Sequence, residues 1–138
     1  MMIRRGDIYI VDLSKIFPEG KHYQRGRRPC VIVSNNMANK YCELVNIIPL
    51  TSKNKHLPHH VLIHSSCLAY EVSWLIPECA TAIDKKYLEY KVGYLPGREM
   101  DNVDRAIKIQ NGIRGYDGYR TRGNKNNSLQ TMRKKAEK

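Results

Sequence analysis

Cationic and hydroxyl side chains stand at the ends of predicted strands in the first 53 residues of the chain. Arg28 directly precedes Pro29 and an apolar run, and Thr51–Lys53 follows the apolar run Leu44–Leu50. The planar guanidinium group of arginine matches the oxygens of a phosphate, and a threonine hydroxyl can donate a hydrogen bond to the same group. If these strand ends meet, they predict a surface that holds a phosphodiester.

The acidic residues favour chemistry without a metal ion. The 13 Asp and Glu residues are dispersed, whereas metal-dependent phosphodiester cleavage needs several carboxylates in one place. Cys30, Cys42, Cys67 and Cys79 form no CxxC pair, and no histidine follows them at zinc-finger spacing. We therefore expect neither a metal site nor a cofactor. Cleavage without metal would use a 2′-hydroxyl as the nucleophile, which restricts the substrate to RNA.

Length and charge indicate one domain with an anionic partner. The chain has 138 residues, 41% of them hydrophobic, and a formal net charge of +11. No apolar run approaches the roughly 20 residues that cross a bilayer. The N-terminus shows no signal-peptide pattern. We expect a cytoplasmic protein that does not bind membranes.

Apolar patterning predicts a mainly β domain with one late helix. Strands are expected at residues 8–13, 30–34, 44–50, 60–63, 72–76 and 79–83, a spacing typical of a barrel or sandwich. Pro29 should open its strand, and Pro49 should mark an edge position or a bulge. Residues 35–40 are turn-rich with room for one helical turn, and a helical face runs from Met100 to Ile113. The predicted domain covers residues 1–115, and residues 116–138 form a flexible basic tail.

Five ordered blocks of sequence resemble the MazF/PemK family of bacterial toxins. They are RGDIYIVDLS (5–14), GRRPCVIVSNN (26–36), NIIPLTSK (46–53), LPHHVLI (57–63) and ECATAIDKKYL (78–88). The resemblance implies a small SH3-like β-barrel of the MazF/PemK/CcdB-like kind, with a C-terminal helix. It also implies a homodimer, an acidic antitoxin, and an mRNA interferase that cuts single-stranded RNA at short sequences. The metal-free route leaves 2′,3′-cyclic phosphate and 5′-hydroxyl ends.

The resemblance assigns the catalytic positions to Arg28 and Thr51. The loop before the arginine departs from the G-S-x-Q pattern of many relatives, and its His22 is a candidate proton shuttle. Of His59 and His60, one is expected to face inward and one outward. The residues expected to contact RNA are Gln24, Arg25, Arg27, Asn35, Asn36, Ser52, Lys53, His59, Ser73 and Glu78.

A second interpretation is a barrel without catalysis. Such a protein would bind RNA, the antitoxin, or a protein target such as gyrase. The altered loop at residues 20–26 favours this alternative, whereas the presence of both Arg28 and Thr51 favours the enzyme.

Overall fold

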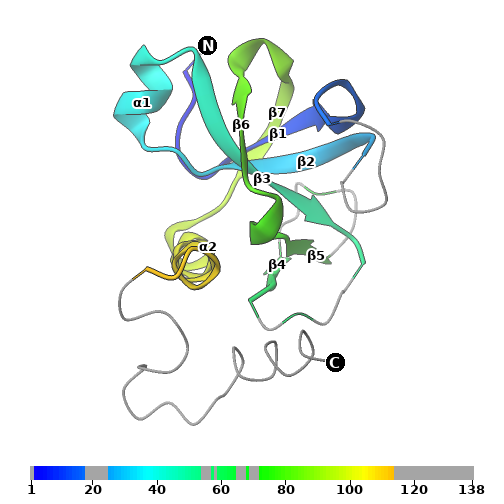
Figure 1. Cartoon of the computed structure of the whole chain (residues 1–138), viewed down its shortest axis with the longest axis vertical. Coiled ribbons are helices and arrows are strands. Elements are labelled where there is room, and N and C mark those ends of the chain that lie inside the picture. Colours follow the sequence, from blue (N-terminus) through cyan, green and yellow to red (C-terminus); the bar gives the residue numbers. More distant parts are fainter. Residues whose placement is uncertain are drawn as a thin grey trace, which may run out of the picture.

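The computed structural model describes residues 2–17, 25–53, 57, 59–64, 68 and 72–113. These residues form a curled antiparallel sheet, a half-barrel, with a helix packed against it (Figure 1). The fold class is the predicted one. The basic tail and the boundary after residue 115 lie outside the described residues, so both stay predictions.

The sheet has the strand order β4-β5-β3-β2-β1-β7, with β6 paired to β3. Its strands are β1 (Asp7–Asp12), β2 (Arg27–Ile32), β3 (Leu44–Thr51), β4 (Val61–His64), β5 (Val72–Leu75), β6 (Thr81–Asp84) and β7 (Leu88–Tyr94). The helices are α1 (Asn36–Tyr41) and α2 (Gly97–Gln110), and the 3₁₀ turns are η1 (Leu13–Lys15), η2 (Pro77–Cys79) and η3 (Lys85–Tyr87).

Alternation along the strands builds one core on each side of the sheet. Tyr9 and Cys30 belong to one buried cluster, while their neighbours Ile8 and Val31 belong to the other. The second cluster includes Val103 of α2, which is fully buried. Helix α2 therefore completes the core on its side of the sheet, as the predicted helical face requires.

Pro49 was expected at an edge or at a bulge, and the edge position was wrong. Strand β3 is central: it pairs with β6 through residues 44–47, with β2 through residues 47–49, and with β5 through residues 50–51. Pro49 stands where β3 leaves β2 and joins β5, and its carbonyl accepts a hydrogen bond from the Ile76 amide at 3.2 Å. A strand that passes between two parts of a sheet bends at that point, and the bend tolerates a residue without an N–H group.

Pro29 also lies inside its strand rather than at the beginning. It sits opposite Ile10 of β1, whereas the pairing of β2 with β3 starts one residue later, at Cys30. Pro29 therefore has a paired strand on one side only, and a proline is tolerated in a strand where one side needs no hydrogen bond from its nitrogen. As a result β2 begins at Arg27, and Arg28 projects from a strand.

Strand β7 was not predicted. Leu88, Tyr90, Val92 and Tyr94 alternate, but two register shifts in the β1–β7 ladder break the link between alternation and burial. Tyr90 and Tyr94 are consequently 58% and 67% exposed. The predicted strand at 79–83 begins later, at Thr81, because η2 occupies Pro77–Cys79.

Candidate active site

Arg28 is held at the start of β2 by the short segment before it. Its Nε donates a hydrogen bond to the carbonyl of Arg25 at 2.8 Å. Gly26, between them, has a φ of +80°, a conformation that glycine adopts without strain. The Gly26 amide donates to Ser14 Oγ at 2.8 Å, and its carbonyl accepts from the Leu13 amide at 2.9 Å. These hydrogen bonds hold the segment before β2 against η1 and so fix the position of the Arg28 side chain.

Thr51 is the last residue of β3, after the bend at Pro49. It lies opposite Trp74 of β5 and is only 5% exposed. Its Oγ1 accepts a long hydrogen bond, 3.3 Å, from the Lys53 amide. Because the hydroxyl is an acceptor in that contact, its proton remains available for another acceptor.

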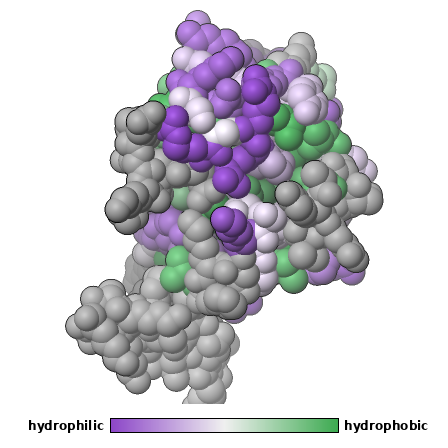
Figure 2. Space-filling view, turned by 90° about the vertical axis from the view of Figure 1, so that its right-hand side faces the viewer, coloured by the Kyte–Doolittle hydropathy of each residue, from purple (hydrophilic) through white to green (hydrophobic). Residues whose placement is uncertain are grey.

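The structure brings Arg28 and Thr51 to one depression with a volume of about 300 Å³. We call it the cationic pocket; it is lined by Arg25, Arg27, Arg28, Pro29, Leu50, Thr51, Ser52, Lys53 and Ser73. Seven of these nine residues were predicted as catalytic or RNA-binding from the sequence. The adjoining ends of β1 and β2 lie on the right of Figure 1, the side that Figure 2 turns toward the viewer, where hydrophilic residues gather.

The pocket lining carries four cations and no carboxylate. Arg27 is neutralised in part, because its Nε donates to Glu89 Oε1 at 2.9 Å and its Nη1 lies 3.9 Å from Asp12 Oδ2. Within the described part of the chain, no acidic group lies within ion-pair distance of the other three cations. Like charges gathered in a concave surface concentrate the field there, so the pocket attracts an anion.

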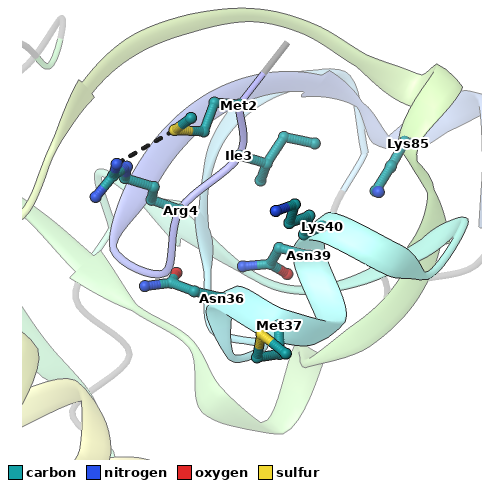
Figure 3. A pocket seen from close by; sticks show the side chains of 8 residues that line it. All are labelled: Met2, Ile3, Arg4, Asn36, Met37, Asn39, Lys40 and Lys85. Carbon is teal, nitrogen blue, oxygen red and sulfur yellow. Dashed lines mark hydrogen bonds between the residues drawn. The ribbon is translucent and has the colours of Figure 1, made fainter.

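Several predicted residues lie elsewhere. His22 and Gln24 fall outside the described residues. Asn35 caps α1 by accepting from the Ala38 amide at 2.8 Å. Asn36 lines a different cavity, of about 570 Å³, together with Met37 and Lys40 of α1 (Figure 3). The structure therefore does not bring Asn35 or Asn36 to the cationic pocket.

His59 and His60 both face inward, so the expectation of one outward ring was wrong. Their side chains are 3% and 0% exposed, because they lie in the turn before β4 and not in the strand itself. His60 Nε2 is 2.8 Å from both carboxylate oxygens of Glu78, and His59 Nε2 is 3.5 Å from Oε1. Burial alone would raise the pKa of Glu78. Contacts with both imidazoles and with its own amide nevertheless hold that pKa well below its usual range.

Sequence reasoning missed the apolar part of the pocket and the role of His60. Pro29 and Leu50 line the pocket beside the predicted polar residues, and each directly adjoins a catalytic candidate in the sequence. His59 was expected to contact RNA, whereas His60 was placed at the start of a strand and given no role. Its pairing with Glu78 depends on a turn and a 3₁₀ segment meeting, which no local pattern in the sequence indicates.

Comparison with known proteins identifies the family. Residues 4–110 match the family described as PemK-like, MazF-like toxin of type II toxin-antitoxin system. The chain belongs to the PemK/MazF family of toxins. A curated relative, the endoribonuclease MazF of Staphylococcus epidermidis, is 34% identical over 123 residues, which cover 87% of this chain and all of the relative. The chain is thus a MazF-type endoribonuclease of a toxin–antitoxin system, which decides against the barrel without catalysis.

Solved structures agree with this fold. MazF from Deinococcus radiodurans superposes with a TM-score of 0.68 at 19% identity, covering 82% of this chain and 99% of that one. An endoribonuclease from a mycobacterial species gives 0.67 at 22% identity, covering 83% and 95%. A further mycobacterial endoribonuclease, solved in complex with its cognate antitoxin, gives 0.63 at 23% identity, covering 81% and 95%. Among the described residues of the toxin, no helix has the length and apolar character needed to cross a membrane.

Proposed function

We propose that this toxin cleaves single-stranded RNA at a short sequence within the cationic pocket, using the 2′-hydroxyl of the RNA as nucleophile. The products are a 2′,3′-cyclic phosphate and a 5′-hydroxyl end. The observation that carries the proposal is the convergence of four cations and the Thr51 hydroxyl on one depression whose lining has no carboxylate. Such a surface binds and neutralises a phosphodiester but offers no carboxylate ligands for a divalent ion.

Each of the two central residues has a part in the reaction. The 2′-oxygen attacks the adjacent phosphorus while the bond to the 5′-oxygen breaks, and charge accumulates on the non-bridging oxygens of the phosphorane. The guanidinium of Arg28 binds those oxygens through its Nη groups, since its Nε is already bonded to Arg25. The Thr51 hydroxyl donates to the same phosphate. The 2′-hydroxyl must lose a proton and the leaving 5′-oxygen must gain one; His22 remains the predicted shuttle, which would accept the first proton and return it to the 5′-oxygen.

The remaining pocket residues would guide the strand. Arg25, Arg27, Ser52 and Lys53 flank the reacting phosphate and are suited to neighbouring phosphates, and Ser73 lies buried beside Thr51 on the adjacent strand. We propose that an acidic antitoxin segment inhibits the toxin by occupying the same cationic surface, and that the toxin acts as a homodimer in the cytoplasm.

The test is incubation of the antitoxin-free protein with a long RNA in EDTA, followed by mapping of the cuts and their end chemistry. Discrete cuts with cyclic phosphate ends, lost in Arg28→Ala, support the proposal. Arg98→Ala is the charge-matched control, because Arg98 is exposed in the first turn of α2 and does not line the pocket. Cuts that disappear in EDTA while circular dichroism shows the protein still folded, or cuts that persist in Arg28→Ala, would overturn it.

A further inference from the structure

A second group of chemically active side chains lies apart from the cationic pocket. His59, His60 and Glu78 come together where the turn before β4 meets η2. None of the three lines the cationic pocket. The mechanism proposed above therefore gives them no role.

The pairing of His60 with Glu78 leaves His59 unexplained. Neither ring nitrogen of His59 makes a hydrogen bond within the described part of the chain, although its side chain is only 3% exposed. Burying a polar group without a partner costs free energy, so such groups in native proteins call for an explanation. His59 Nε2 faces the Glu78 carboxylate, 3.5 Å from Oε1, a charge contact that is too long for a good hydrogen bond.

The spacing of the donor atoms suits a metal ion. One ligand atom from each of the three residues lies within 4.8 Å of the other two, and the closest pair is His60 Nε2 and Glu78 at 2.8 Å. Four tetrahedral ligands around zinc, each about 2.1 Å from the ion, are roughly 3.4 Å apart. The observed separations bracket that value, so small side-chain adjustments bring the three atoms around one ion.

We propose that His59 Nε2, His60 Nε2 and the Glu78 carboxylate bind a zinc ion that fastens the start of β4 to η2. Two imidazoles and one carboxylate form a donor set found in zinc proteins, and imidazole disfavours magnesium and calcium. The histidines are buried while Glu78 is 31% exposed, so water completes the coordination from the side of the carboxylate. This site goes beyond the proposed function, because it takes no part in the cleavage step.

The adjacent histidines were expected to diverge, and the turn explains why they do not. In a strand, consecutive side chains point to opposite faces. His59 and His60 precede β4, and the His60 amide bonds to the Leu57 carbonyl at 3.1 Å within the turn. Their rings meet edge to face with centroids 5.2 Å apart, so both reach the same carboxylate.

Zinc titration of the full-length, chelator-stripped protein tests the proposal. We expect one zinc ion per chain by calorimetry and elemental analysis, a rise in Tm with zinc, and the intense visible absorption of tetrahedral Co²⁺ when cobalt replaces zinc. His59→Ala should bind at least tenfold more weakly. His64→Ala is the matched control, because His64 is exposed on β4 and its loss should change the affinity by less than twofold.

Three results would overturn the site: less than 0.2 zinc per chain, equal weakening by His59→Ala and His64→Ala, or an octahedral cobalt spectrum. Glu78→Gln serves as the second ligand variant if His59→Ala does not fold, and the same tenfold weakening is expected of it. These readouts do not depend on RNA cleavage. A toxin that fails the cleavage test can therefore still pass this one, and the reverse also holds.

Discussion

Two substitutions of Thr51 can separate the contribution of its hydroxyl to catalysis from the contribution of its methyl group to stability. Thr51→Val keeps the shape and deletes the hydroxyl, whereas Thr51→Ser keeps the hydroxyl and deletes the methyl group. The residue is 5% exposed, and the only hydrogen bond described for its side chain is the 3.3 Å contact with the Lys53 amide. The two variants should therefore have opposite effects on activity and on Tm.

The magnitudes follow from these contacts. A hydrogen bond to a charged phosphate contributes about 1.5–3 kcal/mol, so Thr51→Val should slow cleavage by about 10- to 150-fold. Its Tm should fall by less than about 5 °C, because the Lys53 amide, next to exposed positions, can bond to water instead. Thr51→Ser should cleave within about threefold of the wild-type rate while losing about 1 kcal/mol of stability for the buried methyl group.

The assay measures the single-turnover cleavage rate of a short RNA with one site, beside thermal unfolding by circular dichroism. The role of the hydroxyl is refuted if Thr51→Val cleaves within threefold of wild type. It is also refuted if Thr51→Ser loses as much activity as Thr51→Val, since packing would then account for both.

Three further predictions concern the scaffold. Gly26→Ala should destabilise the protein by about 1–2 kcal/mol in urea unfolding, because φ is +80°; the added Cβ meets no atom, so the cost comes from the backbone alone. The control Gly97→Ala, at the first turn of α2, should be neutral or stabilising. Equal losses in the two variants would contradict the backbone argument. Arg5→Ala removes an ion pair with Asp104 of α2 and should lower the free energy of unfolding by about 1–2 kcal/mol. Amide hydrogen exchange should accelerate more in α2 than in β3. An equal increase in both elements would contradict the idea that this ion pair holds α2 in place. Burial raises the pKa of the Cys30 thiol, so the unfolded chain loses that proton first, and the free energy of unfolding should fall by about 1.4 kcal/mol per pH unit as pH rises above about 8.5. Under reducing conditions, urea unfolding of Cys30→Ala between about pH 8.5 and 10.5 should lack this contribution to the pH dependence. An unchanged slope of unfolding free energy against pH would refute the assignment.

The cationic pocket could be predicted because its residues stand next to strongly patterned strands. Arg28 and Thr51 border apolar runs, so locating the two strands in the sequence also locates the strand ends. Their meeting depends on the pairing of β2 with β3, which neighbouring antiparallel strands commonly adopt. Local pattern and simple topology were sufficient here.

The departures arose where tertiary structure overrode local rules. Pro49 was expected at an edge or a bulge because proline lacks an N–H group, yet a bend between two ladders tolerates it equally well. Strand β7 was missed although its alternation is visible in the sequence, and its register shifts against β1 leave two of the alternating residues, Tyr90 and Tyr94, exposed. His59 and His60 were interpreted with strand periodicity although they lie in a turn. Each error concerns a point at which the backbone is irregular.

The pairing of β1 with β7 has a consequence for how the protein is made. Asp7 pairs with Tyr94, and the Leu95 amide bonds to the Gly6 carbonyl at 2.9 Å, so the first of the described strands to be synthesised receives its second neighbour from the last of them. Until then β1 presents an open edge, a template on which a second nascent chain can pair. Helix α2, which covers Ile8 and Val31, is synthesised later still. The domain therefore completes its fold only after β7 and α2 have been synthesised, and truncation before residue 94 leaves an aggregation-prone sheet and not a smaller enzyme.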